Sequence, residues 1–293
     1  MLVSPAGPAK PEPVEMGTAM LTSWGLKVVS APPVEAYGYL AGRDDARLAE
    51  VNAALRDPAV RGVICTRGGY GAQRIVDGMD FAALREDPKV FVGFSDITAL
   101  QLAMWCRIGL ASVHGPMAAW GDRTGEASAR SLYAALTSTD DAVVQARPDE
   151  ETSPVRVDGP SVRGTLLGGN LSLIAATIGT PDLPDLSGAI LLLEETDEAP
   201  YKVDRMLTHL RRSGALAGVA GVADGQFTRC ADGWSTSIVD VLLDRLGDLG
   251  VPVLGGLPVG HGRDQLTVPV GVPATLDVAA GTLTATAAVR EAR

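Results

Sequence analysis

Short apolar runs alternate with helical stretches along the first half of the chain, and this alternation restricts the fold more than any other feature. The apolar runs have the length and β-branched content of buried strands, and they lie at 2–4, 26–29, 62–66, 90–94 and 111–114. Stretches with helical composition or periodicity lie between them, at 12–24, 43–55, 72–78 and 96–106. Strands separated by helices at this interval predict a mostly parallel sheet that is covered on both faces.

A polar, proline-bearing stretch at 139–162 separates this part from a second unit. The second unit opens with a glycine-rich run at 164–171 and continues with a strand at 189–193 and an amphipathic helix at 201–213. Further β segments are expected at 266–270, at 274–278 and near 283–289. We therefore expect an N-terminal domain over 1–140, a linker over 141–162 and a C-terminal α/β domain over 163–293.

Charge and cysteine usage limit the possible partners. The net charge of −10 argues against binding to nucleic acid or an anionic membrane, because both reward clustered Lys and Arg. No apolar run reaches the ~18 residues of a membrane span, and the N-terminus lacks the pattern of a signal peptide. Cys65, Cys106 and Cys230 are far apart and have no metal-type spacing. We expect buried thiols in a reducing cytoplasm, and neither a metal nor a cofactor.

A strand-to-helix junction carries a candidate nucleophile. Ser95 follows the run at 90–94 and precedes a helix, so its hydroxyl lies near the positive helix end and the amide of Asp96 is free to donate. This geometry suits a nucleophilic serine, although Ile97 replaces the second glycine of the Gly-x-Ser-x-Gly elbow. The alternative is that Ser95 only caps the helix, as serine often does.

An activated serine needs a base, and the base needs a third group that orients it. The chain has three histidines. His209 lies on an arginine-rich helix and is expected to face solvent, whereas His114 ends a strand and could be a structural loop residue or part of a pocket wall. His261 is flanked by Gly260 and Gly262, which let the backbone bend so that the imidazole reaches a cleft. An ordinary exposed loop histidine is the alternative for His261.

Two carboxylates end the strand at 189–193. A carboxylate in this position is costly unless it has a partner, and a histidine would suit Glu194. Glu195, the next residue, is expected to point to the opposite side of the strand. Pairing of Glu194 or Glu195 with an arginine is the alternative.

The loop at 67–71 follows a strand and is rich in glycine, but it lacks the residue order of either phosphate-binding motif. Its bare amides suit an oxyanion hole, with one donor from this loop and one from Asp96. Arg67 could bind a substrate carboxylate through its planar guanidinium.

These residues belong to a series of motifs that resembles the serine LD-carboxypeptidases (muramoyltetrapeptide carboxypeptidases), a family that includes microcin-immunity peptidases. The matching motifs occur in the family's order at 4–8, 39–42, 67–71, 93–98, 114–117, 168–171, 193–205 and 258–262. The resemblance implies a flavodoxin-like N-terminal domain with a parallel sheet, a C-terminal α/β domain, and an active site in the cleft between them.

The resemblance also implies roles for individual residues. Ser95 resembles the family's nucleophile, Glu194 its acid and His261 its base. The amides of Gly69 and Asp96 resemble its oxyanion hole. Possible substrate contacts are Arg67, Tyr70 and Tyr201.

The activity that the resemblance implies is metal-independent hydrolysis of an L,D-amide bond, which releases terminal D-alanine from murein tetrapeptides in peptidoglycan recycling. A cytoplasmic homodimer that acts on a small peptide is expected. One alternative is a microcin-immunity-like peptidase that hydrolyses acyl amides of aminoacyl nucleotides, with Trp120 as the candidate stacking residue. An alternative of another class is a non-catalytic protein that binds a small ligand.

Overall fold

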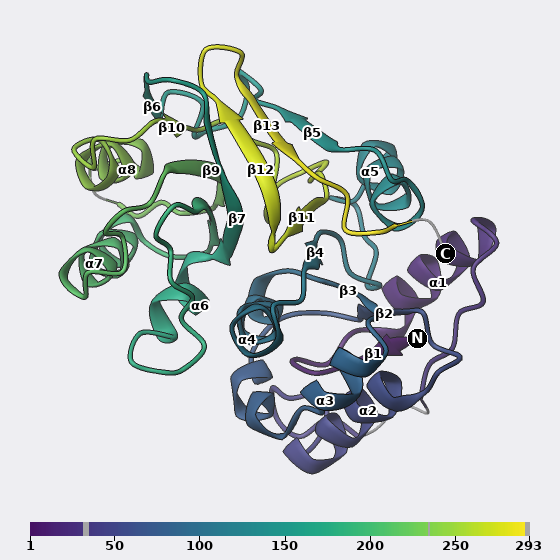
Figure 1. Ribbon diagram of the computed structural model, residues 1–293. Helices are drawn as coiled ribbons and strands as arrows, with labels where there is room; N and C mark the ends of the chain where they lie inside the picture. The colour runs from purple at the N-terminus through teal and green to yellow at the C-terminus, as the bar shows by residue number, and fades with distance from the viewer. Residues whose placement is uncertain (32–34, 234, 291–293) are drawn as a thin grey trace.

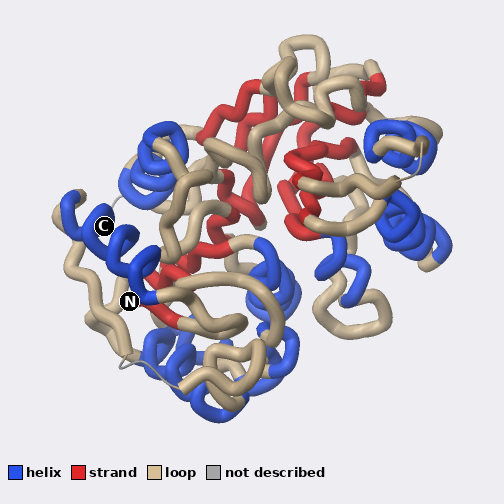
Figure 2. The backbone as a smooth tube through the Cα atoms, turned by 180° about the vertical axis from the view of Figure 1, so that it is seen from behind, coloured by secondary structure: helices blue, strands red, loops and turns tan. Residues whose placement is uncertain are grey.

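Two β-sheets form the framework of the protein (Figure 1). The structure is a computed structural model that describes residues 1–31, 35–233 and 235–290. The first sheet has the strand order β1-β2-β3-β4-β11 and the second has the order β5-β13-β12-β7-β8-β9-β10-β6. Figure 2, seen from behind, shows helices around the outside of both units, with the strands between them.

The first sheet is parallel in its first four strands, as predicted. These strands are β1 (Leu2–Val3), β2 (Gly62–Cys65), β3 (Val90–Gly93) and β4 (Ser112–His114). One face packs against apolar side chains of α2 (Asp44–Arg56), α3 (Phe81–Glu86) and α4 (Thr98–Ile108). The other face packs against α1 (Pro11–Ser23) and α5 (Glu126–Thr137). The sheet is therefore covered on both faces, which confirms the α/β fold class.

Two local expectations for this unit are corrected, and two of its helices were missed. Residues 26–29 form no strand, and Ser30 makes a single bridge to Leu2; Leu26 and Val29 are exposed, so the run does not bury the apolar side chains that suggested a buried strand. The helix expected at 72–78 consists of two 3₁₀ turns, η1 (Ala72–Arg74) and η2 (Val76–Gly78). Helices α3 and α5 were not expected from the sequence pattern.

The last strand of the first sheet comes from the C-terminal part of the chain. Strand β11 (Val268–Val270) pairs antiparallel with β4, so that Val268 faces His114 in the register. The 258–267 segment, which leads into β11, is thereby anchored to the first unit. The pairing ties the two units together beside the ends of β3 and β4.

The second sheet has a parallel centre. Its central strands are β7 (Val162–Asn170), β8 (Ile190–Thr196), β9 (Gly221–Thr228) and β10 (Val253–Leu254). Helices α6 (Leu171–Ala176), α7 (Pro200–Arg212) and α8 (Ile238–Leu246) bury their apolar sides on one face. Strands β12 (Val272–Asp277) and β13 (Thr282–Ala285) extend the sheet antiparallel beside β7.

The stretch expected to be a linker, 141–162, contains two strands. Strand β5 (Ala142–Gln145) pairs with β13, and β6 (Arg156–Val157) pairs with β10, so they form the two edges of the second sheet. How the chain divides into independently folding domains stays a prediction.

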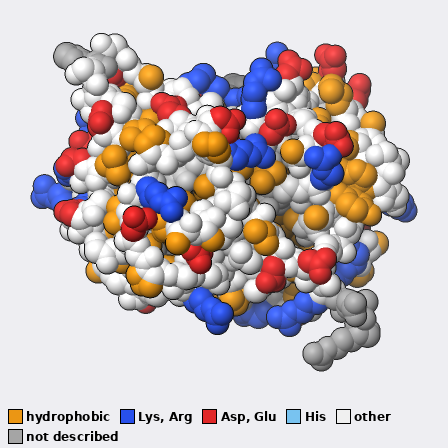
Figure 3. Space-filling view, turned by 90° about the horizontal axis from the view of Figure 1, so that it is seen from above, with side chains coloured by type: hydrophobic (Ala, Val, Ile, Leu, Met, Phe, Trp, Pro, Cys, Tyr) orange, Lys and Arg blue, Asp and Glu red, His pale blue; other side chains and the backbone are white. Residues whose placement is uncertain are grey.

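The surface carries mixed charges (Figure 3), and the cysteines form no disulfide among the described residues. Acidic and basic side chains are interspersed on the face seen in Figure 3. No helix of the described residues is both long and apolar enough to cross a membrane. All three cysteines are free; Cys65 and Cys230 are buried and Cys106 is partly buried.

One carboxylic acid is buried inside the second sheet and predicts a pH effect on stability. Asp224 of β9 is fully buried, and neither of its oxygens has a hydrogen-bond partner among the described residues. Burial raises the pKa of Asp224 to about 8, above the ordinary 3.8. Because the pKa is higher in the folded state, the native state loses stability as the pH rises from about 4 to 8.

We therefore expect Asp224→Asn to stabilise the protein by about 2–4 kcal/mol at pH 8 and to change stability little at pH 4. Urea unfolding at both pH values measures the difference. Asp122→Asn, which changes an exposed aspartate, is the control and should show no such pH dependence. A stability change of Asp224→Asn that is equal at both pH values would contradict the explanation.

Candidate active site

The turn after β3 holds Ser95 in an unusual backbone conformation. Ser95 opens a 3₁₀ turn, η3 (Ser95–Ile97), that leads into α4, and its φ is +64°. This left-handed conformation costs a non-glycine residue about 1–2 kcal/mol, and such strain is concentrated at functional sites. Gly93 allows the sharp turn, since a Cβ there would lie 2.6 Å from Cγ2 of Ile97. The Ser95 side chain makes no helix-capping hydrogen bond, so the capping alternative is wrong.

The glycine loop at 67–71 lies directly against this turn. A Cβ on Gly68 would come within 3.0 Å of the Ser95 Oγ and within 3.3 Å of the Asp96 nitrogen. The buried Asp96 carboxylate accepts a hydrogen bond from the Ala72 amide at 2.8 Å, which fastens the loop to the turn. Burial raises the pKa of Asp96. The side chain of Asp96 therefore holds the loop that carries Gly69 beside the backbone of Ser95 and Asp96.

His261 and Glu194 form a close pair, as the sequence predicted. Nδ1 of His261 lies 2.6 Å from Oε2 of Glu194, and the Glu194 side chain is fully buried. Burial would raise the pKa of Glu194, but the charges and contacts of His261 and His114 outweigh it and lower this pKa to about 2. Glu194 is therefore the ionised acceptor and Nδ1 of His261 is the donor, which leaves Nε2 of His261 free.

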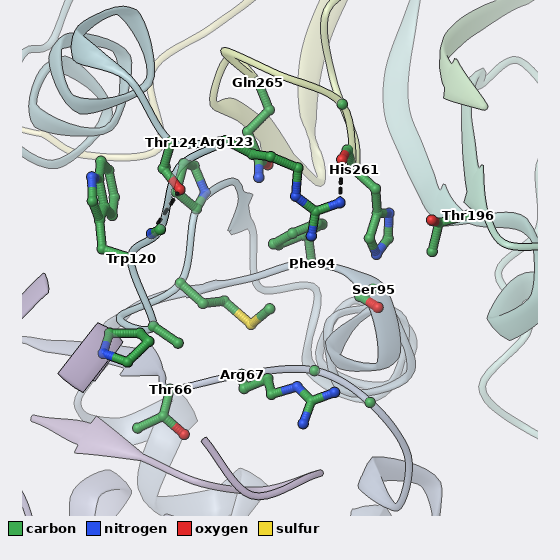
Figure 4. Close-up of a pocket in the computed structure, with 18 of the residues that line it drawn as sticks. Thr66, Arg67, Phe94, Ser95, Trp120, Arg123, Thr124, Thr196, His261 and Gln265 are labelled. Atoms are coloured by element: carbon green, nitrogen blue, oxygen red, sulfur yellow. Dashed lines mark hydrogen bonds between the residues drawn. The ribbon is translucent and has the colours of Figure 1, made fainter. Parts of the chain in front are cut away.

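The loop around His261 is held in place by a glutamine that sequence reasoning missed. The Gly262 amide donates to Oε1 of Gln226 at 2.7 Å, and Nε2 of Gln226 donates to Oε1 of Glu150 at 2.9 Å. Arg123 donates from Nη1 to the His261 carbonyl at 3.2 Å (Figure 4). Since Gln226 and Arg123 have no recognisable spacing from His261, no sequence signal could have found them.

The other two histidines have different places. His114 is fully buried, and its Nε2 lies 3.8 Å from Oε1 of Glu194, the carboxylate oxygen that His261 does not contact. Its ring packs edge-on against Phe94, with the ring centroids 5.7 Å apart. His209 is exposed on α7, as predicted.

Glu195 points away from Glu194, as predicted, and its carboxylate is held by neighbouring side chains and an amide of the second unit. Its carboxylate accepts hydrogen bonds from the side chain of Asn170 at 2.9 Å and from the amide and hydroxyl of Ser172 at 2.8 and 2.7 Å. Neither Glu194 nor Glu195 has an arginine within ion-pair distance among the described residues, so the arginine alternative is wrong for both.

Ser95 and His261 open onto one cavity of about 620 Å³. Its walls come from both units, with Arg67 and Gly69 on one side and Thr196 and His261 on the other. In Figure 4 the His261 ring lies above the Ser95 hydroxyl. No hydrogen bond joins these two side chains among the contacts of the described residues, and catalytic hydrogen bonds in ligand-free enzymes are often long.

The three residues that were expected to contact the substrate differ in their position relative to the cavity. Arg67 lines the cavity, and its Nη1 donates to the Pro8 carbonyl at 2.9 Å. Tyr70 and Tyr201 are exposed and are not among the described residues that line the cavity. Their role in binding stays a prediction. In the described part of the chain, no group of three or more His, Cys, Asp or Glu side chains is arranged to hold a metal.

Gly260 permits the contact between His261 and Glu194. Its φ is +133°, and a Cβ there would lie 2.9 Å from both Cβ and Oε2 of Glu194. We expect Gly260→Ala to displace the imidazole and lower kcat about 10²-fold, because small misplacements of catalytic groups have effects of this size. Steady-state kinetics measures the effect.

Gly179→Ala is the matched control, since Gly179 also has a positive φ (+87°) but has open space around its Cβ position. This variant should lose some stability and keep its kcat. Equal kcat values for both glycine variants would show that the close approach to Glu194 is unimportant.

A serine at a strained strand-to-helix turn and a histidine–carboxylate pair, meeting at one cavity between two α/β units, define a serine-type hydrolase. Family models agree with this class: residues 1–115 match the LD-carboxypeptidase N-terminal domain and 163–276 match the LD-carboxypeptidase C-terminal domain. The chain belongs to the LD-carboxypeptidase family.

Individual relatives cover nearly the whole chain. A candidate carboxypeptidase of Streptomyces coelicolor is 45% identical over 97% of this chain and 91% of its own length. The murein tetrapeptide carboxypeptidase of Pseudomonas aeruginosa is 31% identical over 94% of this chain and 92% of its own.

Solved structures also match nearly the whole chain. The muramoyltetrapeptide carboxypeptidase of Oxalobacter formigenes has a TM-score of 0.85 and 32% identity, and the match covers 97% of this chain and 98% of that one. The microcin C7 self-immunity protein MccF, solved with glutamyl sulfamoyl guanosine, has a TM-score of 0.87. Its identity is 22%, over 97% of this chain and 94% of MccF, so this likeness shows the fold alone.

Proposed function

We propose that this protein is a serine carboxypeptidase that hydrolyses the L,D-amide bond before a terminal D-alanine in murein tetrapeptides. The observation that carries the proposal is the 2.6 Å contact between His261 and Glu194 at the cavity that Ser95 also lines. The names of the Pseudomonas aeruginosa and Oxalobacter formigenes relatives support a murein peptide as the substrate. From the family resemblance we also propose a cytoplasmic homodimer that acts in peptidoglycan recycling.

In the first half of the reaction, the Ser95 Oγ attacks the carbonyl carbon and Nε2 of His261 takes the hydroxyl proton. Glu194 keeps the imidazole in the tautomer with hydrogen on Nδ1 and stabilises the imidazolium that forms. The amides of Gly69 and Asp96 donate to the oxyanion. His261 then gives its proton to the amine of D-alanine as the C–N bond breaks.

In the second half, a water molecule attacks the acyl-enzyme ester. His261 takes a proton from the water and returns it to the Ser95 oxygen when the ester bond breaks. Arg67, on the cavity wall, would bind a carboxylate of the peptide.

A turnover assay with matched synthetic tetrapeptides tests the proposal. One peptide ends in an L,D-linked alanine and the other in a D,D-linked alanine, and mass spectrometry follows the release of D-alanine. We expect release from the L,D-linked peptide alone. Release from neither peptide, together with no labelling of Ser95 by a fluorophosphonate, would favour a non-catalytic binding protein.

A second candidate activity is hydrolysis of an acyl amide of an aminoacyl nucleotide. It is favoured by Trp120, which lines the cavity and could stack on a base. Incubation with an aminoacyl sulfamoyl nucleoside separates the two activities, because the peptidase proposed above should leave that compound intact.

A further inference from the structure

An ion pair on the cavity wall joins the ends of β8 and β9. Nε of Arg229 lies 2.6 Å from Oδ1 of Asp197, and Nη2 of Arg229 lies 2.6 Å from Oδ2, so the contact is bidentate. Nη2 also donates to the Thr196 hydroxyl at 3.1 Å. Asp197 and Arg229 line the same cavity as Ser95 and His261, and their side chains are 60% and 52% exposed.

The free energy gained from the ion pair does not account for the backbone conformations of its two residues. Asp197 has a φ of +62° and Arg229 a φ of +57°, so both adopt the left-handed conformation that glycine usually takes. For Arg229 this conformation alone costs more than a solvent-exposed ion pair typically returns. Strained residues of this kind concentrate at ligand sites, where the conformation aims a side chain at the ligand.

The charges on the cavity wall are unequal. Lys10, Arg67, Arg123 and Arg229 are cationic, whereas Asp197 is the only carboxylate among the described residues that line the cavity. This local excess of positive charge stands in a chain of net charge −10, so it is not a consequence of composition. The wall suits a substrate with several carboxylates, and Asp197 is the one described residue of the lining whose charge is opposite to that of an ammonium.

The pair also lies close to the candidate catalytic residues. Asp197 follows Glu194 by three residues, and its amide donates to the Thr228 carbonyl at 3.0 Å, which fixes the turn. The hydrogen bonds of Arg229 lower the pKa of Asp197, and the charge of His261 adds to this effect. A group bound by the pair would therefore belong to a part of the substrate near the reacting bond.

We propose that Asp197 and Arg229 determine specificity for a substrate side chain that ends in an amino-acid zwitterion. The ammonium of that group would pair with Asp197 and the carboxylate with Arg229, in place of their contact with each other. This inference rests on the proposed function, because it describes how the peptide is selected.

Three synthetic L,D-tetrapeptides that differ only at the third residue test the proposal. The third residue is meso-diaminopimelate, with a zwitterionic end; L-lysine, with an ammonium only; or norleucine, with no charge. Wild-type kcat/KM should be highest for the diaminopimelate peptide, about 10- to 100-fold above the norleucine peptide, with the lysine peptide between them.

The two variants should act differently on the three peptides. Arg229→Gln is expected to lower kcat/KM for the diaminopimelate peptide to the level of the lysine peptide. Asp197→Asn should lower kcat/KM for the diaminopimelate and lysine peptides toward the value for the norleucine peptide. Arg211→Gln is the control, because Arg211 makes a bidentate pair with Asp248 outside the cavity, and it should leave all three values unchanged.

The outcomes separate this inference from the proposed function. Equal wild-type kcat/KM for the three peptides, or an equal loss on all three in both variants, would overturn the specificity role. No release of D-alanine from any peptide by the wild-type enzyme would overturn the proposed function, and the specificity role with it.

Discussion

Ser95→Ala is expected to lower kcat on an L,D-tetrapeptide by about 10⁴- to 10⁶-fold, because a nucleophile cannot be replaced by the rest of the site. Residual turnover would come from binding and from the amides of the oxyanion hole. Release of D-alanine measures the loss, and labelling by a fluorophosphonate should disappear with it. Full turnover by Ser95→Ala would exclude Ser95 as the nucleophile.

Ser95→Gly separates the chemistry of this position from its backbone. Ser95 has a φ of +64°, a conformation that glycine adopts without strain and alanine does not. Both variants should be equally inactive, but Ser95→Gly should be about 1 kcal/mol more stable than Ser95→Ala in urea unfolding. Equal stability would mean that the turn stores no strain.

The parallel sheets could be predicted because each strand is indicated by the composition and length of a short run of residues. The run at 90–94 has β-branched and aromatic residues in a length typical of strands, and β3 forms within it. The run at 26–29 is also apolar apart from Lys27, but Leu26 and Val29 are exposed and no strand forms there. Strand β11 was expected as a strand, but its place in the first sheet depends on the tertiary contact with β4.

The candidate site could be predicted in part for a similar reason. Ser95 follows the buried strand β3, Glu194 lies near the end of the buried strand β8, and His261 stands between two glycines, so each has a local signal. Arg229 and Asp197 have none. They reach the cavity through left-handed backbone conformations at the ends of two strands, which composition and periodicity do not encode.

His261→Ala is expected to lower kcat nearly as much as Ser95→Ala, and the double variant should be no worse than Ser95→Ala, because residues that act as a unit are not additive. Glu194→Gln should lower kcat about 10²- to 10⁴-fold, since the imidazolium loses its negative partner. His114→Gln should lower it less than about 10-fold, because His114 is not among the described residues that line the cavity. If His114→Ala abolished turnover and His261→Ala did not, the base would be His114.

The lowered pKa of Glu194 predicts a pH-dependent contribution to stability. Glu194→Gln tests it, because glutamine has a similar shape but no charge. The pKa of Glu194 is lowered to about 2 in the folded protein, below the ordinary 4.5, so its ionisation stabilises the native state above pH 4.5 and this stabilisation is lost as the pH falls toward 2. Glu194→Gln lacks it. The variant should therefore be less stable than the wild type by about 1–3 kcal/mol at pH 7, and the difference should shrink as the pH falls below 4.5. Urea unfolding at pH 7 and pH 3.5 measures both differences, and a gap that stays constant would show that the charge of Glu194 does not stabilise the fold.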